Sequence, residues 1–279
     1  MNLLLSLSAM PSIASEFVAK QKLLSHFLFY KRKIEIEIDK KSYVVRTASS
    51  FNDLLQVFRL RHEVFTKEYG LKRQSMGLEC DFFDLNCDYI IILDKASQRV
   101  VGCYRMRCSL FTQDFYSATE FELDKFLSEP GVKVELSRAC IAKDFRNGVV
   151  ISLLWKGLIE YVKAANADYL FGLSSVHAEH PGDLKPMFDK IQSQDALLVD
   201  ANIKPTKNYD SSYYFKERLV QSIDETEQQM EIPSLLKAYL KAGAKVHGVP
   251  AYDKDFSCFD LLTILRFADL SASFDKKYV

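Results

Sequence analysis

The sequence lacks several features that mark common protein classes. Its 37 basic and 37 acidic side chains cancel, so the bulk charge points to neither nucleic acid nor an anionic membrane surface. No apolar run reaches the ~20 residues that a membrane-spanning helix needs. The six cysteines form no C-x-x-C pair, and several lie in apolar runs where a thiol behaves as a small hydrophobe. We therefore expect a reduced, cytoplasmic protein with no nucleic-acid partner.

The N-terminal segment has no basic residues in front of its first leucines, which makes it a poor signal peptide. Residues 1–33 instead have the pattern of an amphipathic helical segment, because apolar residues alternate with Lys20 and Lys22 and the segment ends in Lys31, Arg32 and Lys33. Such a helix could lie on the inner face of a membrane. Packing on the protein's own surface is an equally open alternative.

Residues 34–279 have the composition and length to form a single domain with a large core. Within it, residues 181–232 are rich in turn formers and are expected to be a helical and loop insertion. Alternation and β-branched runs predict strands at residues 34–38, 43–46, 89–93, 100–108, 133–141, 169–173, 245–249 and 259–265. The middle strands form an antiparallel meander, and the sheet is expected to be mostly antiparallel.

Helical spacing alternates with these strands. A capping pair, Ser50 and Asp53, predicts a helix that continues until Gly70, and a second helix follows Gly148 and ends near Ala164. A third helix begins at Pro233 and stops at Gly243. The expected fold class is mixed α/β, with a twisted, mostly antiparallel sheet flanked by helices.

Charged residues recur at positions where the pattern predicts burial. They occur in one order along the chain: Arg61 and Phe65 on the first helix, Asp81 and Asp84 before the meander, Arg105 on one strand, and Glu135 and Arg138 on the next. Packing alone does not explain such a set, and we interpret it as an active site. A structural network of ion pairs is the alternative.

This ordered set resembles the acyl-homoserine-lactone synthases and, over a longer span, the bacterial N-acyl amino acid synthases and ornithine N-acyltransferases, a haemolysin-labelled group of GNAT-like acyltransferases. The resemblance covers residues 43–177. The stretches at residues 232–240 and 248–253 resemble the amino acid acyltransferase branch. The lactone synthases place a tryptophan shortly after the phenylalanine, and only Tyr69 is near here. The resemblance implies a GNAT-like sheet with a bulged, splayed central strand.

The resemblance further implies transfer of a fatty acyl group from acyl carrier protein to the α-amine of an amino acid, either to make an ornithine-type lipid precursor or an N-acyl amino acid. Such a transfer needs a base and dipoles that hold the oxyanion. Glu135 is the candidate base, and Arg138, Asp84 and Arg105 complete the predicted catalytic set. The predicted residues for binding the substrate and the acyl donor are Arg61, Phe65, Asp81, Ala139, Cys140, Ile141, Arg146, Asn147 and Gly148.

Strand parity adds a constraint on this set. In a regular strand Glu135 and Ser137 share one face and Arg138 lies on the other, so Glu135 and Arg138 can meet only across a distortion. We therefore expect a β-bulge, which would free N–H groups from Ala139 to Ile141 for the thioester carbonyl and the pantetheine arm.

The helix after Arg146, Asn147 and Gly148 begins where the family holds the phosphopantetheine phosphate, and a helix N-terminus suits an anion. Val149 and Val150 follow without the usual second glycine, which favours acyl carrier protein over coenzyme A as the thioester donor. No tightly bound cofactor is expected. No metal is expected either, because His177 and His180 have no cysteine or carboxylate at ligand spacing.

Two other functions stay open from the sequence. One is acyl-homoserine-lactone synthesis from S-adenosylmethionine, which would release methylthioadenosine. The other is a non-catalytic protein that binds acyl groups or lipid.

Overall fold

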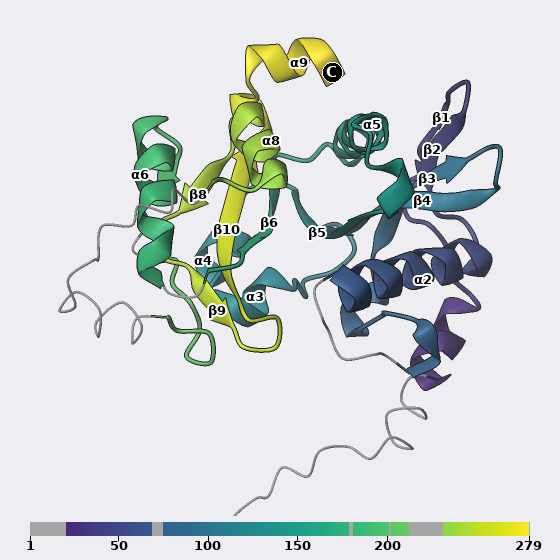
Figure 1. Cartoon of the computed structure of the whole chain (residues 1–279), viewed down its shortest axis with the longest axis horizontal. Coiled ribbons are helices and arrows are strands. Elements are labelled where there is room, and N and C mark those ends of the chain that lie inside the picture. Colours follow the sequence, from purple (N-terminus) through teal and green to yellow (C-terminus); the bar gives the residue numbers. More distant parts are fainter. Residues whose placement is uncertain (1–20, 69–74, 179–180, 201, 212–230, 279) are drawn as a thin grey trace, which may run out of the picture.

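The computed structural model describes residues 21–68, 75–178, 181–200, 202–211 and 231–278. Within these residues ten strands form one sheet, in the order β1-β2-β3-β4-β5-β6-β10-β8-β7, with β9 paired to β10 (Figure 1). The strands are β1 (Glu37–Asp39), β2 (Tyr43–Thr47), β3 (Asp88–Asp94), β4 (Arg99–Cys108), β5 (Lys133–Ile141), β6 (Tyr169–Val176), β7 (Leu197–Leu198), β8 (Lys245–His247), β9 (Ala251–Asp253) and β10 (Cys258–Arg266).

The sheet is mostly antiparallel, and only the β5–β6 and β7–β8 pairs are parallel among the described strands. The α-helices labelled within the described residues are α2 (Phe51–Glu68), α3 (Ser117–Glu120), α4 (Asp124–Ser128), α5 (Val149–Ala165), α6 (Lys185–Ser193), α8 (Ser234–Ala242) and α9 (Ala272–Tyr278). The predicted mixed α/β class with helices flanking the sheet is confirmed. The short strand β9 is absent from the sequence prediction.

The start of α2 follows from the predicted capping pair. The Ser50 N–H donates to the Asp53 carboxylate at 3.2 Å, and the Asp53 N–H donates to the Ser50 hydroxyl at 3.2 Å. The apolar stripe of α2 is fully buried at Leu54, Val57 and Phe58. Arg61 continues this stripe, which carries its guanidinium into the interior.

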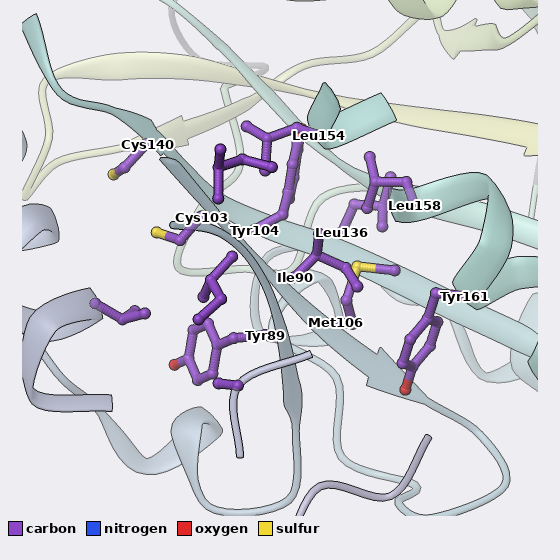
Figure 2. Close-up of a cluster of buried hydrophobic side chains, with 14 of the residues drawn as sticks. Tyr89, Ile90, Cys103, Tyr104, Met106, Leu136, Cys140, Leu154, Leu158 and Tyr161 are labelled. Carbon is purple, nitrogen blue, oxygen red and sulfur yellow. The ribbon is translucent and has the colours of Figure 1, made fainter. Parts of the chain in front are cut away.

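Helices α2 and α5 cover opposite faces of the sheet's first half (Figure 1). Tyr89 of β3 meets Phe58 of α2, with ring centroids 6.2 Å apart. The next residue, Ile90, faces α5, where Leu154 and Leu158 join the same buried cluster (Figure 2). The period-2 alternation of a strand therefore gives β3 two apolar faces, as its continuous run of isoleucines requires.

Strands β5 and β6 pair only over four residues each. Lys133–Leu136 pairs with Tyr169–Gly172, but β5 runs on to Ile141 beside β4, and β6 runs on to Val176 beside β10. At the last pair a Cβ on Gly172 would lie 2.3 Å from the Leu136 carbonyl oxygen, so only glycine permits this close approach. The two strands diverge beyond this apex, which confirms the predicted splay.

The predicted bulge is also present in β5. Cys103 of β4 faces Cys140, whereas Arg105 faces Ser137, so β5 holds one extra residue between these pairs. Arg138 absorbs the distortion with a φ of 54°, in the left-handed region that non-glycine residues seldom adopt.

Two segments were expected to stand apart from the central sheet. From the predicted insertion, residues 185–193 form α6, and β7 extends the edge of the sheet beside β8. Of the N-terminal segment, residues 21–27 are helical, and the ring of Phe27 packs 5.1 Å from that of Phe58. Residues 1–20, including Lys20, lie outside the described residues. None of the described helices is long and apolar enough to cross a membrane.

Candidate active site

A cavity of about 370 Å³ lies where β5 and β6 diverge. One wall comes from the bulged end of β5, and the opposite wall from Leu173, Ser174 and Ser175 of β6. The rim is completed by α2, by the residues before α3, by the start of α8 and by the β9–β10 turn. A space between two splayed strands exposes backbone polar groups to whatever occupies it.

A network of ion pairs adjoins the β5 wall of the cavity. Its members are three arginines and three carboxylates: Arg61, Arg105, Arg138, Glu79, Asp81 and Asp84. The Asp84 carboxylate lies 2.8 Å from both Arg61 and Arg105, and Asp81 lies 2.7 Å from Arg105. Three positive charges thus balance three negative ones, which offsets much of the cost of burying them.

The network fixes the charge state of its central acid. Burial alone would raise the pKa of Asp84, but the guanidinium groups of Arg61 and Arg105 hold it well below its usual range. The structure therefore brings together five of the residues predicted from the sequence: Arg61, Asp81, Asp84, Arg105 and Arg138. Glu79 and Tyr89, which both bond to Arg61, are further members that the sequence analysis missed.

Arg138 is the cation of this network that lines the cavity. Its guanidinium carbon lies 4.8 Å from the ring centre of Tyr116 and 5.7 Å from that of Phe65. Its nearest carboxylate contacts are comparatively long, at 3.3 Å to Asp81 and 3.5 Å to Glu79. Its buried Nε has no hydrogen-bond partner among the described residues. The carboxylates therefore leave the Arg138 guanidinium incompletely paired.

The bulge also decides which amides of β5 face the gap. The Ala142 N–H donates to the carbonyl oxygen of Val101 in β4. Because the N–H groups of a strand alternate in direction, the Cys140 N–H also points toward β4, and the N–H groups of Ala139 and Ile141 point away from it. The Arg146 side chain donates to the Ile141 carbonyl on that same open side. Ala139 lines the cavity, whereas the Cys140 thiol is buried beside Cys103 in the core.

Glu135 lies apart from this group. It is completely buried, and its carboxylate oxygens accept N–H bonds from Tyr116 at 3.0 Å and from Ser117 at 2.6 Å. It thereby anchors the start of α3, and it does not contact Arg138. Proton transfer from the cavity to Glu135 would need an intervening water or hydroxyl, and its role as base stays a prediction.

The first turn of α5 lies beyond the C-terminal, bulged end of β5 and has few capping contacts. Gly148 is the N-cap with a φ of 83° and provides no capping side chain, while Asn147 accepts only the Val149 N–H at 3.1 Å. Val149 itself is 49% exposed. An anion can therefore approach the remaining amides of this helix end.

A second cluster of carboxylates was missed by the sequence analysis. Glu120, Asp253 and Asp260 each offer an oxygen within 4.8 Å of the other two. Asp253 and Asp260 line the cavity. Asp260 is a charged residue inside the mostly apolar strand Cys258–Arg266, which is the same signal that revealed Arg105. Of the two histidines considered in the sequence analysis, His177 lines the cavity and His180 lies outside the described residues.

The chain is similar in sequence to a known domain family and to several curated proteins. Residues 60–156 match the family model of the acetyltransferase (GNAT) domain. The chain is 27% identical over 255 residues to an L-ornithine N(alpha)-acyltransferase of Brucella abortus, covering 85% of this chain and 89% of the relative. It is also 27% identical over 238 residues to the Rhodobacter capsulatus enzyme of that name, covering 80% and 90%. The resemblance to GNAT-like N-acyltransferases is confirmed.

Solved structures give a weaker likeness to this GNAT-like chain. The acyl-homoserine-lactone synthase LasI is 13% identical with a TM-score of 0.47, covering 85% of this chain and 94% of its own. FeeM, an N-acyl amino acid synthase from uncultured soil microbes, is 10% identical with a TM-score of 0.45, again covering 85% and 94%.

Proposed function

We propose that this protein is an N-acyltransferase that moves a fatty acyl group from the phosphopantetheine thioester of acyl carrier protein to the α-amine of an amino acid. The observation that carries the proposal is the cavity between β5 and β6, bordered by Arg138 and Ala139 of the bulged segment of β5. The GNAT domain and the ornithine N-acyltransferase relatives support the same reaction class.

The thioester carbonyl is proposed to lie against the β5 side of the cavity. There the N–H groups of Ala139 and Ile141 point into the gap left by the missing β6 partner. Attack by the amine turns the carbonyl oxygen into an oxyanion, and fixed amide donors stabilise that charge without reorganising. The thiol of the phosphopantetheine arm is then the leaving group, and the acyl chain stays on the new amide nitrogen.

The donor's phosphate is proposed to bind at the open first turn of α5. This turn follows β5 after the short segment 142–148, so an extended pantetheine arm along β5 would lead from the helix end to the carbonyl site. The turn has one glycine, Gly148, followed by Val149 and Val150, and this arrangement suits a single phosphodiester better than an adenosine pyrophosphate. Acyl carrier protein is therefore the proposed donor.

Purified protein incubated with acyl carrier protein loaded with acyl chains of several lengths, and with a panel of amino acids, tests the proposal. Mass spectrometry should find an N-acyl amino acid and free carrier-protein thiol in equal amounts. Acyl-coenzyme A in a parallel reaction should be used at least about tenfold less efficiently.

Three results would count against this function. Release of methylthioadenosine from S-adenosylmethionine would indicate lactone synthesis. Tight binding of acyl carrier protein with no turnover of any amino acid would indicate a non-catalytic binding protein. Efficient use of acyl-coenzyme A alone would overturn the donor assignment while leaving the reaction class intact.

A further inference from the structure

The three carboxylates of Glu120, Asp253 and Asp260 form the acidic pocket, a cluster that the ion-pair network does not explain. All three residues are buried, with exposures of 0%, 4% and 4%. No ion pair of the described residues includes any of them, in contrast with Asp81 and Asp84. A group of buried acids without a cation is unstable unless it is protonated or waits for a positively charged ligand.

The three acids differ in the protein hydrogen-bond donors that they contact. Asp253 accepts the N–H groups of Asp255 and Phe256 at 2.8 and 3.1 Å, and Asp260 accepts the Ser175 hydroxyl at 2.5 Å. As a carboxylate, Glu120 receives no hydrogen bond from a protein donor among the described residues, and it lies close enough to Asp260 for the two acids to share a proton. The buried hydroxyl of Ser117, which lines the cavity, is likewise unpartnered within the described part of the chain.

The dimensions of the acidic pocket fit an ammonium group. The three oxygens lie within 4.8 Å of one another, so an atom placed between them can lie within about 2.8 Å of each, which is the usual N–H···O distance for a charged donor. An alkylammonium has three N–H donors for three carboxylates. A divalent cation would need about six oxygens, partly from waters, and it is the competing occupant that the test below includes.

Arg138 and the acidic pocket both lie close to Tyr116. Burial raises the pKa of the Tyr116 hydroxyl, with Glu120, Asp260 and Asp253 adding to the rise and Arg138 opposing it, so Tyr116 feels both charged groups. The cavity thus presents a cation at the bulge and carboxylates at the β9–β10 side. An amino acid with a second ammonium on its side chain matches both ends, with its carboxylate toward Arg138.

We propose that the acidic pocket binds the side-chain ammonium of a diamino acid acceptor and so selects the acyl acceptor of this enzyme. The inference rests on the proposed N-acyltransferase function. Neutral amino acids would leave the buried carboxylates unpaired, and they are therefore disfavoured by desolvation as well as by the lost attraction.

The test compares L-ornithine with L-norvaline, which has the same carbon chain but no side-chain amine. In wild-type protein kcat/KM for ornithine should exceed that for norvaline by about 30-fold or more. Glu120→Gln and Asp260→Asn should remove most of this preference by raising the KM for ornithine, with little change for norvaline. Asp255→Asn is the matched control, because Asp255 is exposed and only its backbone N–H contacts Asp253.

The outcomes separate the two proposals. Equal use of ornithine and norvaline by wild-type protein, or an unchanged preference in both variants, overturns the acidic pocket and leaves the N-acyltransferase in place. Failure of wild-type protein to acylate any amino acid overturns the enzyme function itself. Calorimetry with ornithine alone and with Ca²⁺ or Mg²⁺ alone adds a readout without turnover: stoichiometric metal binding that displaces ornithine would overturn the ammonium assignment.

Discussion

Glu120→Gln should make this protein more stable at neutral pH while it impairs acceptor selection. Burial, together with the charges of Asp260 and Asp253, raises the pKa of Glu120 to about 10. The native state therefore keeps a proton on Glu120 at pH 7, and the unfolded chain has released it. A glutamine has no such proton to hold.

The magnitude follows from proton linkage. Above the ordinary pKa of 4.5, the folded state binds one more proton at Glu120 than the unfolded state, so the free energy of unfolding falls by about 1.4 kcal/mol for each pH unit. The loss continues up to the folded pKa of about 10. The Glu120→Gln variant should therefore gain about 3 kcal/mol over wild type at pH 7 but under about 1 kcal/mol at pH 5.

Urea unfolding followed by circular dichroism from pH 5 to pH 8 measures this difference. Glu122→Gln is the matched control, because Glu122 is exposed and pairs only with the exposed Lys204 at 3.3 Å, so its effect should stay within about 1 kcal/mol. Equal unfolding free energies of the Glu120→Gln variant and wild type at pH 7, or parallel pH dependences, would refute the buried, protonated Glu120.

Four further predictions concern the network, the apex, the helix end and the proposed base. Asp84 has a lowered pKa, so its stabilising contribution is present above the ordinary value of 3.8 and is lost as the pH falls below it; acid unfolding below pH 3.8 should be shallower in Asp84→Asn. Gly172→Ala should cost about 1–3 kcal/mol in urea unfolding because its Cβ meets a carbonyl oxygen, and an unchanged midpoint would contradict the close approach. Val149→Glu should raise stability by about 0.3–1 kcal/mol at the N-terminus of α5 yet raise the KM for acyl carrier protein, with the acceptor KM unaffected; an unaltered donor KM would exclude the phosphate site. Glu135→Gln should lower stability by about 1–3 kcal/mol, and near-normal turnover of the folded variant would leave Glu135 only as the anchor of α3.

The strands and long helices were predictable because their signals are local. The alternation in residues 34–46, the isoleucine run of β3 and the Ser50–Asp53 cap each depend on neighbours within a few residues. Parity in β5 was enough to predict the bulge that the register of Cys103 and Arg105 then shows. Local patterns carry such features because the backbone itself enforces them.

The site could be predicted only where charge stood out against an apolar pattern. Arg61, Arg105 and Arg138 were found in this way, but the pairing of Arg61 and Arg138 with Glu79 depends on loop geometry that no periodicity encodes. Glu120 and Asp260 are 140 residues apart in sequence, and only the insertion of β10 beside β6 brings them together. For Glu135 the sequence pattern was conspicuous, but the structure shows its carboxylate accepting two backbone N–H groups at the start of α3.

The position of β10 has a consequence for biosynthesis. This strand lies between β6 and β8 in the sheet, although it follows both of them in the sequence. Until residues 258–266 leave the ribosome, β6 lacks its antiparallel partner and one cavity wall lacks Asp260. A nascent chain can therefore assemble the ion-pair network before residues 258–266 are made, whereas the carboxylate cluster of Glu120, Asp253 and Asp260 forms only after them.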